Sequence, residues 1–156
     1  MVIMKNSNLI SFIALVGLTF LFTGPVHGQP TLREVLDETQ IIDKPECAVI
    51  TVGFNLRVRY KKHFPFKSGE ELRIQLEPIA LTPSEKEAIT QEESIIPPES
   101  EIAAIDQIIY EGGENGDQFL TIFFKHPVSY TVQQGSDFRS IVIKVFLPST
   151  TTPCSP

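Results

Sequence analysis

The chain is poor in the residues on which several common classes of protein depend. Its 156 residues include 2 cysteines and no tryptophan, and 13 lysines and arginines stand against 19 aspartates and glutamates. Two cysteines allow one disulfide at most, too few for a disulfide-held miniprotein or a structural zinc site built on cysteines. The net charge of −6 opposes binding to nucleic-acid phosphates, which needs a basic surface. The composition predicts one domain with an ordinary apolar core and no nucleic-acid partner.

Motifs for catalysis and metal binding are also missing from the sequence. It has no Gly-x-Ser-x-Gly, His-Glu-x-x-His or Cys-x-x-Cys motif, and no calcium loop of alternating acidic ligands. His126 shares its register with Phe124 and Val128, which indicates a packed or edge histidine, and His63 is interpreted as a turn residue. We therefore expect no enzyme, no metal site and no cofactor.

The first 28 residues have the layout of a signal peptide. Lys5 gives a positive start, residues 9–22 form a run of 14 without a charge, and residues 26–28, Val-His-Gly, offer a cleavage site. A membrane-spanning helix needs about 20 apolar residues. We therefore expect cleavage after Gly28, export to the periplasm and no stable membrane span in the mature protein, with an uncleaved anchor as the alternative.

Export would place both cysteines in an oxidising compartment, where disulfides persist. Cys47 and Cys154 lie near the two ends of the mature domain, so a bond between them would close nearly all of it into one loop. The chain-entropy model gives such a loop about 4–5 kcal/mol of stabilisation. The alternatives are two free thiols, or a bond from Cys154 to another molecule.

The mature chain, residues 29–156, is predicted to be a single β-domain. Five segments are predicted to be strands, most of them by alternation of apolar and polar residues: residues 50–60, 72–76, 102–110, 119–130 and 141–145. Residues 30–42 contain Thr31 followed by Glu34, a capping-box pattern that predicts a short helix or turn. Residues 82–101, with six glutamates and three prolines, are predicted to be an exposed acidic loop with one helical turn near 85–90.

The two halves of this β-region repeat each other. Residues 51–60 and 121–130 align without a gap and share Thr, Phe, Val and Tyr at equivalent places. Each half, residues 50–78 and 119–147, reads as a strand, a turn and a second strand. The repeat predicts an all-β fold of two small antiparallel sheets packed as a sandwich, because neither sheet could bury its apolar side alone. The alternative is a chance likeness between amphipathic strands.

The second half also resembles a known family. Residues 105–147 run through a strand, a glycine turn, an apolar strand, a Pro-Val-x-Tyr step and Arg139 ahead of the last strand. This succession is similar to the AMIN domain, a non-catalytic envelope-targeting module found ahead of cell-wall amidases and in type IV pilus secretins. The chain departs from the family at Phe138, near the place of a proline, and at residues 144–145. The resemblance implies a periplasmic module that binds peptidoglycan or docks an envelope protein.

Basic residues gather on one strand of the first half. Four of the mature chain's twelve lysines and arginines fall within six positions: Arg57, Arg59, Lys61 and Lys62. They predict a positive patch for the carboxylates of peptidoglycan stem peptides or for an acidic partner. The resemblance adds Arg139 as a further ligand-binding candidate. Basic residues also keep exposed edge strands from pairing with other chains, an equally good interpretation of the same pattern.

Two functions of different classes follow from these patterns. The first is a non-catalytic, exported cell-envelope module that binds peptidoglycan or localises an envelope complex. The alternative is a protein-interaction subunit, or the N-terminal piece of a larger periplasmic protein. Residues 148–156, rich in Ser, Thr and Pro, would suit a linker in that case.

Overall fold

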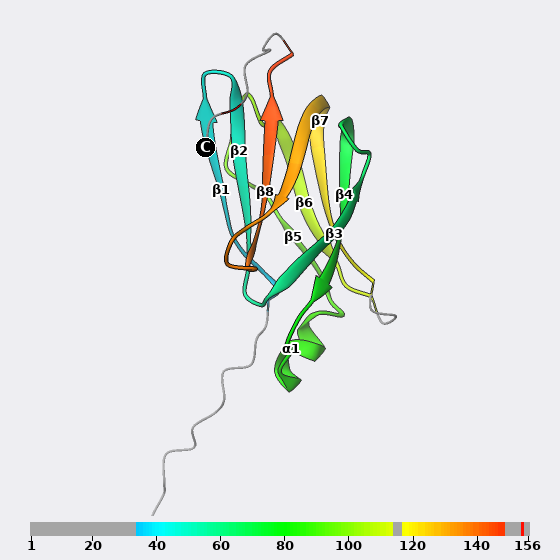
Figure 1. The fold of residues 1–156 in the computed structure, drawn as a ribbon. Coiled ribbons are helices and arrows are strands. Elements are labelled where there is room, and N and C mark those ends of the chain that lie inside the picture. The colour runs from blue at the N-terminus through cyan, green and yellow to red at the C-terminus, as the bar shows by residue number, and fades with distance from the viewer. Residues whose placement is uncertain (1–33, 114–116, 149–153, 155–156) are drawn as a thin grey trace, which may run out of the picture.

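The computed structural model describes residues 34–113, 117–148 and 154. Figure 1 shows that this part of the chain consists of strands and one short helix, α1 (Pro83–Ala88). The strands are β1 (Leu36–Lys44), β2 (Cys47–Phe54), β3 (Val58–Phe64), β4 (Ser68–Pro78), β5 (Glu92–Ile95), β6 (Ile105–Glu111), β7 (Gln118–Gln134) and β8 (Ser140–Phe146). The paired strands are antiparallel, so the all-β prediction is confirmed. The predicted signal peptide lies outside the described residues.

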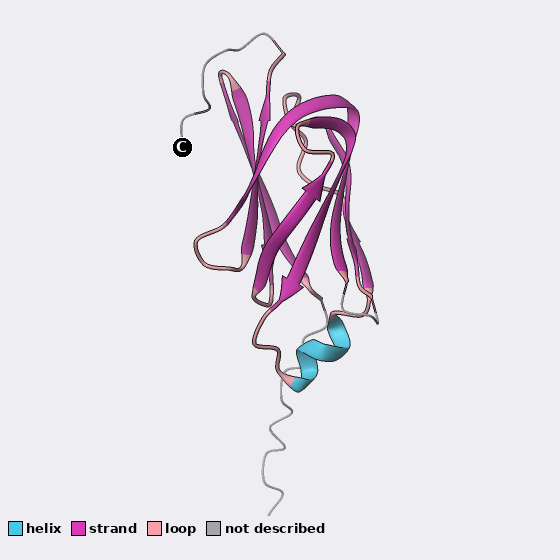
Figure 2. Cartoon of the chain, turned by 45° about the vertical axis from the view of Figure 1, so that its right-hand side comes forward, coloured by secondary structure: helices cyan, strands magenta, loops and turns pink. Residues whose placement is uncertain are grey.

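The sheet bends at β7, which belongs to both of its groups of strands. The order along the hydrogen-bonded path is β1-β2-β8-β7-β4-β3, with β6 on β7 and β5 on β6. The first half of β7 pairs with β4 and β6, and its second half pairs with β8 and with the start of β4. Glu71 pairs with Phe123 but Gly69 pairs with Val128, so β7 bulges between Phe123 and Val128 and bends. Figure 2 shows a long strand arching from one group of strands to the other. The predicted sandwich is therefore hydrogen-bonded as one continuous sheet.

Apolar side chains of both groups of strands form the core. The fully buried ones include Ile50 and Val52 of β2, Leu72 and Ile74 of β4, Leu120 and Ile122 of β7, and Ile141 and Ile143 of β8. They alternate along their strands with polar or half-buried residues. The scaffold thus keeps one face of each strand for packing and leaves the other for contacts with solvent or a ligand.

The internal repeat is visible in the strand pairing. Ile50 in β2 pairs with Ile143 in β8. Leu120 in β7 lies 70 positions after Ile50, and its partner, Ile74 in β4, lies 69 positions before Ile143. These are the offsets at which the two halves align in sequence, so equivalent residues make equivalent pairs.

The strand-turn-strand unit is confirmed in each half, since β3 pairs with β4 and the second part of β7 pairs with β8. The halves nevertheless do not form one separate sheet each. The last strand of each half pairs with the first part of the long strand of the other half, β4 with β7 and β8 with β2. The opening strands correspond as well, because Ile41 of β1 faces Ile50 and Tyr110 of β6 faces Leu120. The exchange makes each half depend on the other.

The segment predicted as one strand, residues 50–60, is two strands. β2 ends at Phe54 and β3 begins at Val58. The turn that precedes β8 forms hydrogen bonds with both ends of this break. The N–H of Phe54 donates to the carbonyl of Arg139, and the N–H of Val58 to that of Phe138, each at 2.8 Å. Alternation alone could not show this break, because the two hydrogen bonds come from a turn 80 and 85 positions away.

The prediction of a short helix or turn within residues 30–42 was wrong. Residues 36–44 form β1, which pairs with β2 along its length. Leu36 and Thr39 are buried in this pairing, so tertiary contacts outweigh the local capping signal. Thr31, the first residue of that signal, lies outside the described residues.

The acidic segment, residues 82–101, is more ordered than an exposed loop. It contains the predicted helical turn as α1, whose Thr82 and Glu85 form a capping box, and strand β5, which was not predicted. Glu93 of β5 accepts the N–H groups of Val35 and Leu36 at 2.6 and 2.8 Å. The segment is thereby tied to the start of β1.

The predicted disulfide is present. Cys47 at the start of β2 is bonded to Cys154, 107 positions later, with 5.9 Å between their Cα atoms. Both side chains are buried. Within the described part of the chain, no helix has the length and apolar character needed to cross a membrane.

Candidate functional site

The predicted basic residues divide into groups with different surroundings. Arg59 and Lys61 of β3 share one carboxylate oxygen of Glu77 in β4, at 3.0 and 3.3 Å. The hydrogen bond and charge of Lys61, with a smaller effect of Arg59, hold the pKa of Glu77 below its usual range. All three side chains are about half exposed, and ion pairs of this kind contribute little stability. Their charges therefore stay accessible to a ligand.

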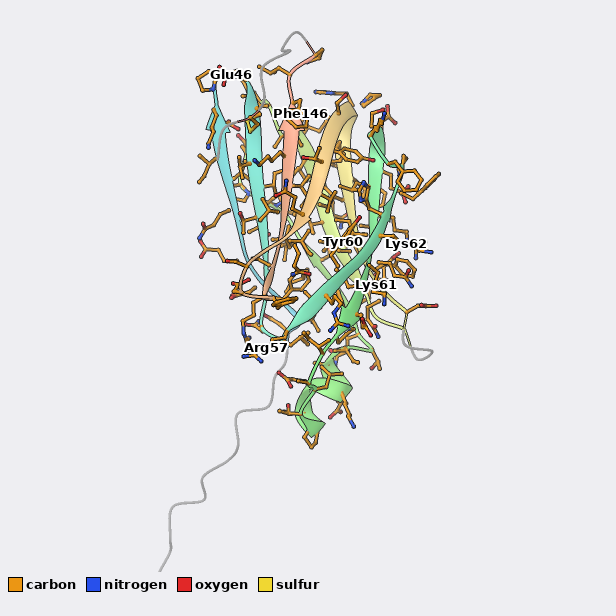
Figure 3. The ribbon with its side chains drawn as sticks, viewed as in Figure 1. Glu46, Arg57, Tyr60, Lys61, Lys62 and Phe146 are labelled. Carbon is orange, nitrogen blue, oxygen red and sulfur yellow. A yellow bond between two sulfur atoms is a disulfide. The ribbon has the colours of Figure 1, made fainter. Side chains whose placement is uncertain are left out.

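Arg139 and Arg57 lie instead at the break between β2 and β3. The Nη1 atom of Arg139 donates to the carbonyl oxygen of Asn55 at 2.6 Å. The backbone N–H of Arg139 donates to Asp137, and this bond, together with one from Ser140, lowers the pKa of Asp137. Arg139 thus braces the break. Arg57 is exposed beside it, and Figure 3 shows it at the start of β3.

The position of Lys62 is set by a bulge in β3. The register between β3 and β4 shifts between Tyr60 and Lys62, so Lys62 pairs with Gln75. Further along, Phe64 pairs with Arg73, and directly paired residues have side chains on the same face. Figure 3 shows Lys61 and Lys62 close together on β3. The outer face of the β3–β4 pair therefore carries Arg59, Lys61, Lys62 and Phe64.

A cleft of about 660 Å³ opens on this outer face. Its lining is Lys62, His63, Phe64, Pro65, Phe66, Gly69, Glu70, Glu71, Arg73, Gln75 and Phe119. Phe64 and Phe66 are 70% and 72% exposed, with their rings edge to face at 6.4 Å. The guanidinium of Arg73 lies over the ring of Phe119 at 4.1 Å and pairs with Glu111 at 2.8 Å. We call this feature the aromatic cleft.

Hydrogen bonds from His63 and Tyr130 to backbone carbonyls fix the turn that carries Phe64 and Phe66. The Nε2 atom of His63 lies 3.1 Å from the carbonyl oxygen of Phe66, and its Nδ1 lies 2.7 Å from the hydroxyl of Tyr60. A carbonyl only accepts, so Nε2 carries a hydrogen and donates to Phe66. The hydroxyl of Tyr130 donates to the carbonyl of Pro65 at 3.0 Å. Burial raises the pKa of both tyrosines, which keeps their hydroxyls protonated as donors.

The two histidines have different surroundings from those predicted. His63 lies at the end of β3 and anchors the turn through its ring, rather than only occupying it. His126 is exposed in the bulge of β7, because the bulge takes it out of register with Val128. Among the described residues, no group of three or more His, Cys, Asp or Glu side chains is arranged to hold a metal ion.

Comparisons with known proteins give no match: no family model, no curated protein and no solved structure matches the chain. The resemblance to the AMIN domain therefore stays a prediction.

The aromatic cleft was missed by sequence reasoning, although one signal for it was available. Residues 63–67, His-Phe-Pro-Phe-Lys, place two large apolar residues in a turn, where small or polar residues are usual. Gln75 and Phe119 could not have been added to them, because their places follow from the pairing of β4 with β3 and β7.

Proposed function

We propose that this chain is a non-catalytic, exported cell-envelope module that binds peptidoglycan through the outer face of β3 and β4. The observation that carries the proposal is the presence of basic side chains and the aromatic cleft on one face of an acidic domain. Peptidoglycan offers carboxylates on its stem peptides and sugar rings in its glycan strands, and such a face suits both. The Cys47–Cys154 bond supports export to the periplasm, because disulfides persist outside the cytosol.

The charges of this face suit a carboxylate ligand. Arg59, Lys61 and Lys62 bring three positive charges to this face. The carboxylate of Glu77 forms ion pairs with two of them, Arg59 and Lys61. Because Glu77 is exposed, a carboxylate from the ligand can replace it at little cost in free energy. Binding should weaken as salt is added, since screening acts on exposed charges.

Sedimentation with purified peptidoglycan sacculi tests the proposal. The variant Arg59→Gln/Lys61→Gln, which leaves the lining of the aromatic cleft unchanged, should bind several-fold less than the wild type. The matched control is Lys86→Gln/Lys125→Gln, which removes the same charge from α1 and from the bulge of β7, and it should bind normally. Equal binding by the wild type and both variants, each folded by circular dichroism, would exclude the basic face as the binding surface.

Docking of an envelope protein is the second candidate function. The exposed rings of Phe64 and Phe66 favour it, because aromatic residues are enriched at protein interfaces. If this candidate is correct, the wild type should not sediment with sacculi and should instead be crosslinked to an envelope protein through the turn between β3 and β4.

A further inference from the structure

We propose that the aromatic cleft is a carbohydrate site that takes the uncharged sugar rings of a glycan strand, stacked against Phe64 and Phe66. The choice of a glycan strand as the polymer rests on the proposed function. The cleft itself is a separate feature from the ion pairs of Arg59 and Lys61, so the two ideas can fail independently.

The size and lining of the cleft suit sugar rings. Its volume of about 660 Å³ lies within the range of about 300–1,000 Å³ that is usual for ligand pockets. Phe64 and Phe66 give exposed apolar surfaces for the C–H faces of sugar rings, whereas the guanidinium of Arg73 covers one face of the Phe119 ring. The Nε2 atom of Gln75 donates to Asp117 at 2.9 Å, which fixes its amide and leaves the amide oxygen able to accept from a hydroxyl.

The charge of the cleft favours an uncharged ligand. Its lining holds two cationic side chains, Lys62 and Arg73, and two carboxylates, Glu70 and Glu71. Arg73 already pairs with Glu111 at 2.8 Å. A phosphate or carboxylate would find no net positive charge there, whereas hydroxyl and amide groups would find both donors and acceptors. Glu70 and Glu71 also oppose insertion of the turn into an anionic membrane, where basic flanks are favoured.

The internal repeat gives an equivalent turn that is built without exposed aromatic rings. At the repeat's offset of 70, residues 64–66 correspond to residues 134–136, Gln-Gly-Ser, in the turn between β7 and β8. There the amide of Gln134 accepts the N–H of Tyr60 and donates to the carbonyl of Ser140, at 2.6 and 3.1 Å. The equivalent turn is thus closed by a polar side chain. Phe64 and Phe66 are specific to one half, which is the half that carries the basic strand.

Titration with the β-1,4-linked N-acetylglucosamine tetramer tests this proposal on the disulfide-bonded protein. Calorimetry should show saturable binding by the wild type, and amide shifts in NMR spectra should centre on β3, β4 and their turn. The variant Phe64→Ala/Phe66→Ala should bind about tenfold more weakly or worse, because aromatic anchors carry most of the affinity of such sites. The matched control, Ile42→Ala/Ile96→Ala, removes two other exposed apolar side chains and should bind as the wild type does.

Several results would overturn the proposal. They are no saturable binding of the tetramer, shifts centred on other strands, or equal affinity of the wild type and the Phe64→Ala/Phe66→Ala variant. Sedimentation of the wild type with phosphatidylglycerol vesicles but no tetramer binding would assign the rings to a membrane surface instead. Sacculus binding without tetramer binding would overturn the glycan site alone, and tetramer binding without sacculus binding would overturn only the proposed function.

Discussion

Replacement of Arg139 separates a structural role from a ligand-binding role. Its Nη1 atom donates to the carbonyl of Asn55 at 2.6 Å, where β2 has ended and β3 has not begun. A hydrogen bond from a charged group contributes about 1.5–3 kcal/mol, and the exposure of this one places it near the lower value. Arg139→Gln should therefore lower the free energy of unfolding by about 1.5 kcal/mol. Sacculus binding by the folded variant should stay unchanged.

Urea unfolding followed by circular dichroism measures this change. The control is Arg57→Gln, which removes the same charge from an exposed side chain nearby and should change stability by about 0.5 kcal/mol at most. If Arg139→Gln unfolds at the same urea concentration as the wild type but binds sacculi less well, Arg139 is a ligand contact and the bracing role is wrong.

Two further predictions concern the disulfide and acid stability. Reduction of the bond between Cys47 and Cys154 should lower the free energy of unfolding by about 4–5 kcal/mol, because it frees a loop of 107 positions. In the denatured protein, the two thiols should react with an alkylating agent only after reduction. Labelling of the thiols without reduction would contradict the presence of the bond. The pKa of Asp137 is lowered by hydrogen bonds to Arg139 and Ser140, so its contribution to stability is full above its usual value of 3.8 and is lost as pH falls through the lower folded value. Asp137→Asn should flatten the fall in stability below about pH 4, and an unchanged acid profile would argue against these hydrogen bonds in solution.

The repeat and the strand content could be predicted because they depend on local patterns. Alternation of apolar and polar residues follows from the two-residue period of a strand, and the match between residues 51–60 and 121–130 needs only the sequence. The pairing of Cys47 with Cys154 could be predicted from the expected export and from the count of two cysteines.

The exchange of strands between the halves could not be predicted, because it depends on which edges meet in space. A strand-turn-strand unit pairs equally well with itself or with its copy as far as the sequence shows. The break after Phe54 has the same origin, since its bonds come from the carbonyls of Phe138 and Arg139. Strand β1 was missed because the capping pattern of Thr31 and Glu34, just ahead of it, was interpreted as a short helix or turn.

The candidate site was only partly visible for similar reasons. The basic residues were found from their density in the sequence, but their partners were not. The bulge between Tyr60 and Lys62 sets which side chains share a face with Phe64, and a one-residue shift of register changes that set. Arg139 was taken as a ligand candidate from a family resemblance, whereas its contact with Asn55 gives it a local structural role.

Site-specific photocrosslinking to sacculi tests the central claim most directly. A photoreactive phenylalanine would replace Phe64, on the outer face of the β3–β4 pair, and in a second protein Ile42 of β1, which is 57% exposed and far from that face in sheet order. After irradiation and digestion of the sacculi, the account predicts muropeptides joined to the protein with the probe at residue 64 and none with the probe at residue 42. Equal crosslinking at both positions, or crosslinking at residue 42 alone, would contradict it.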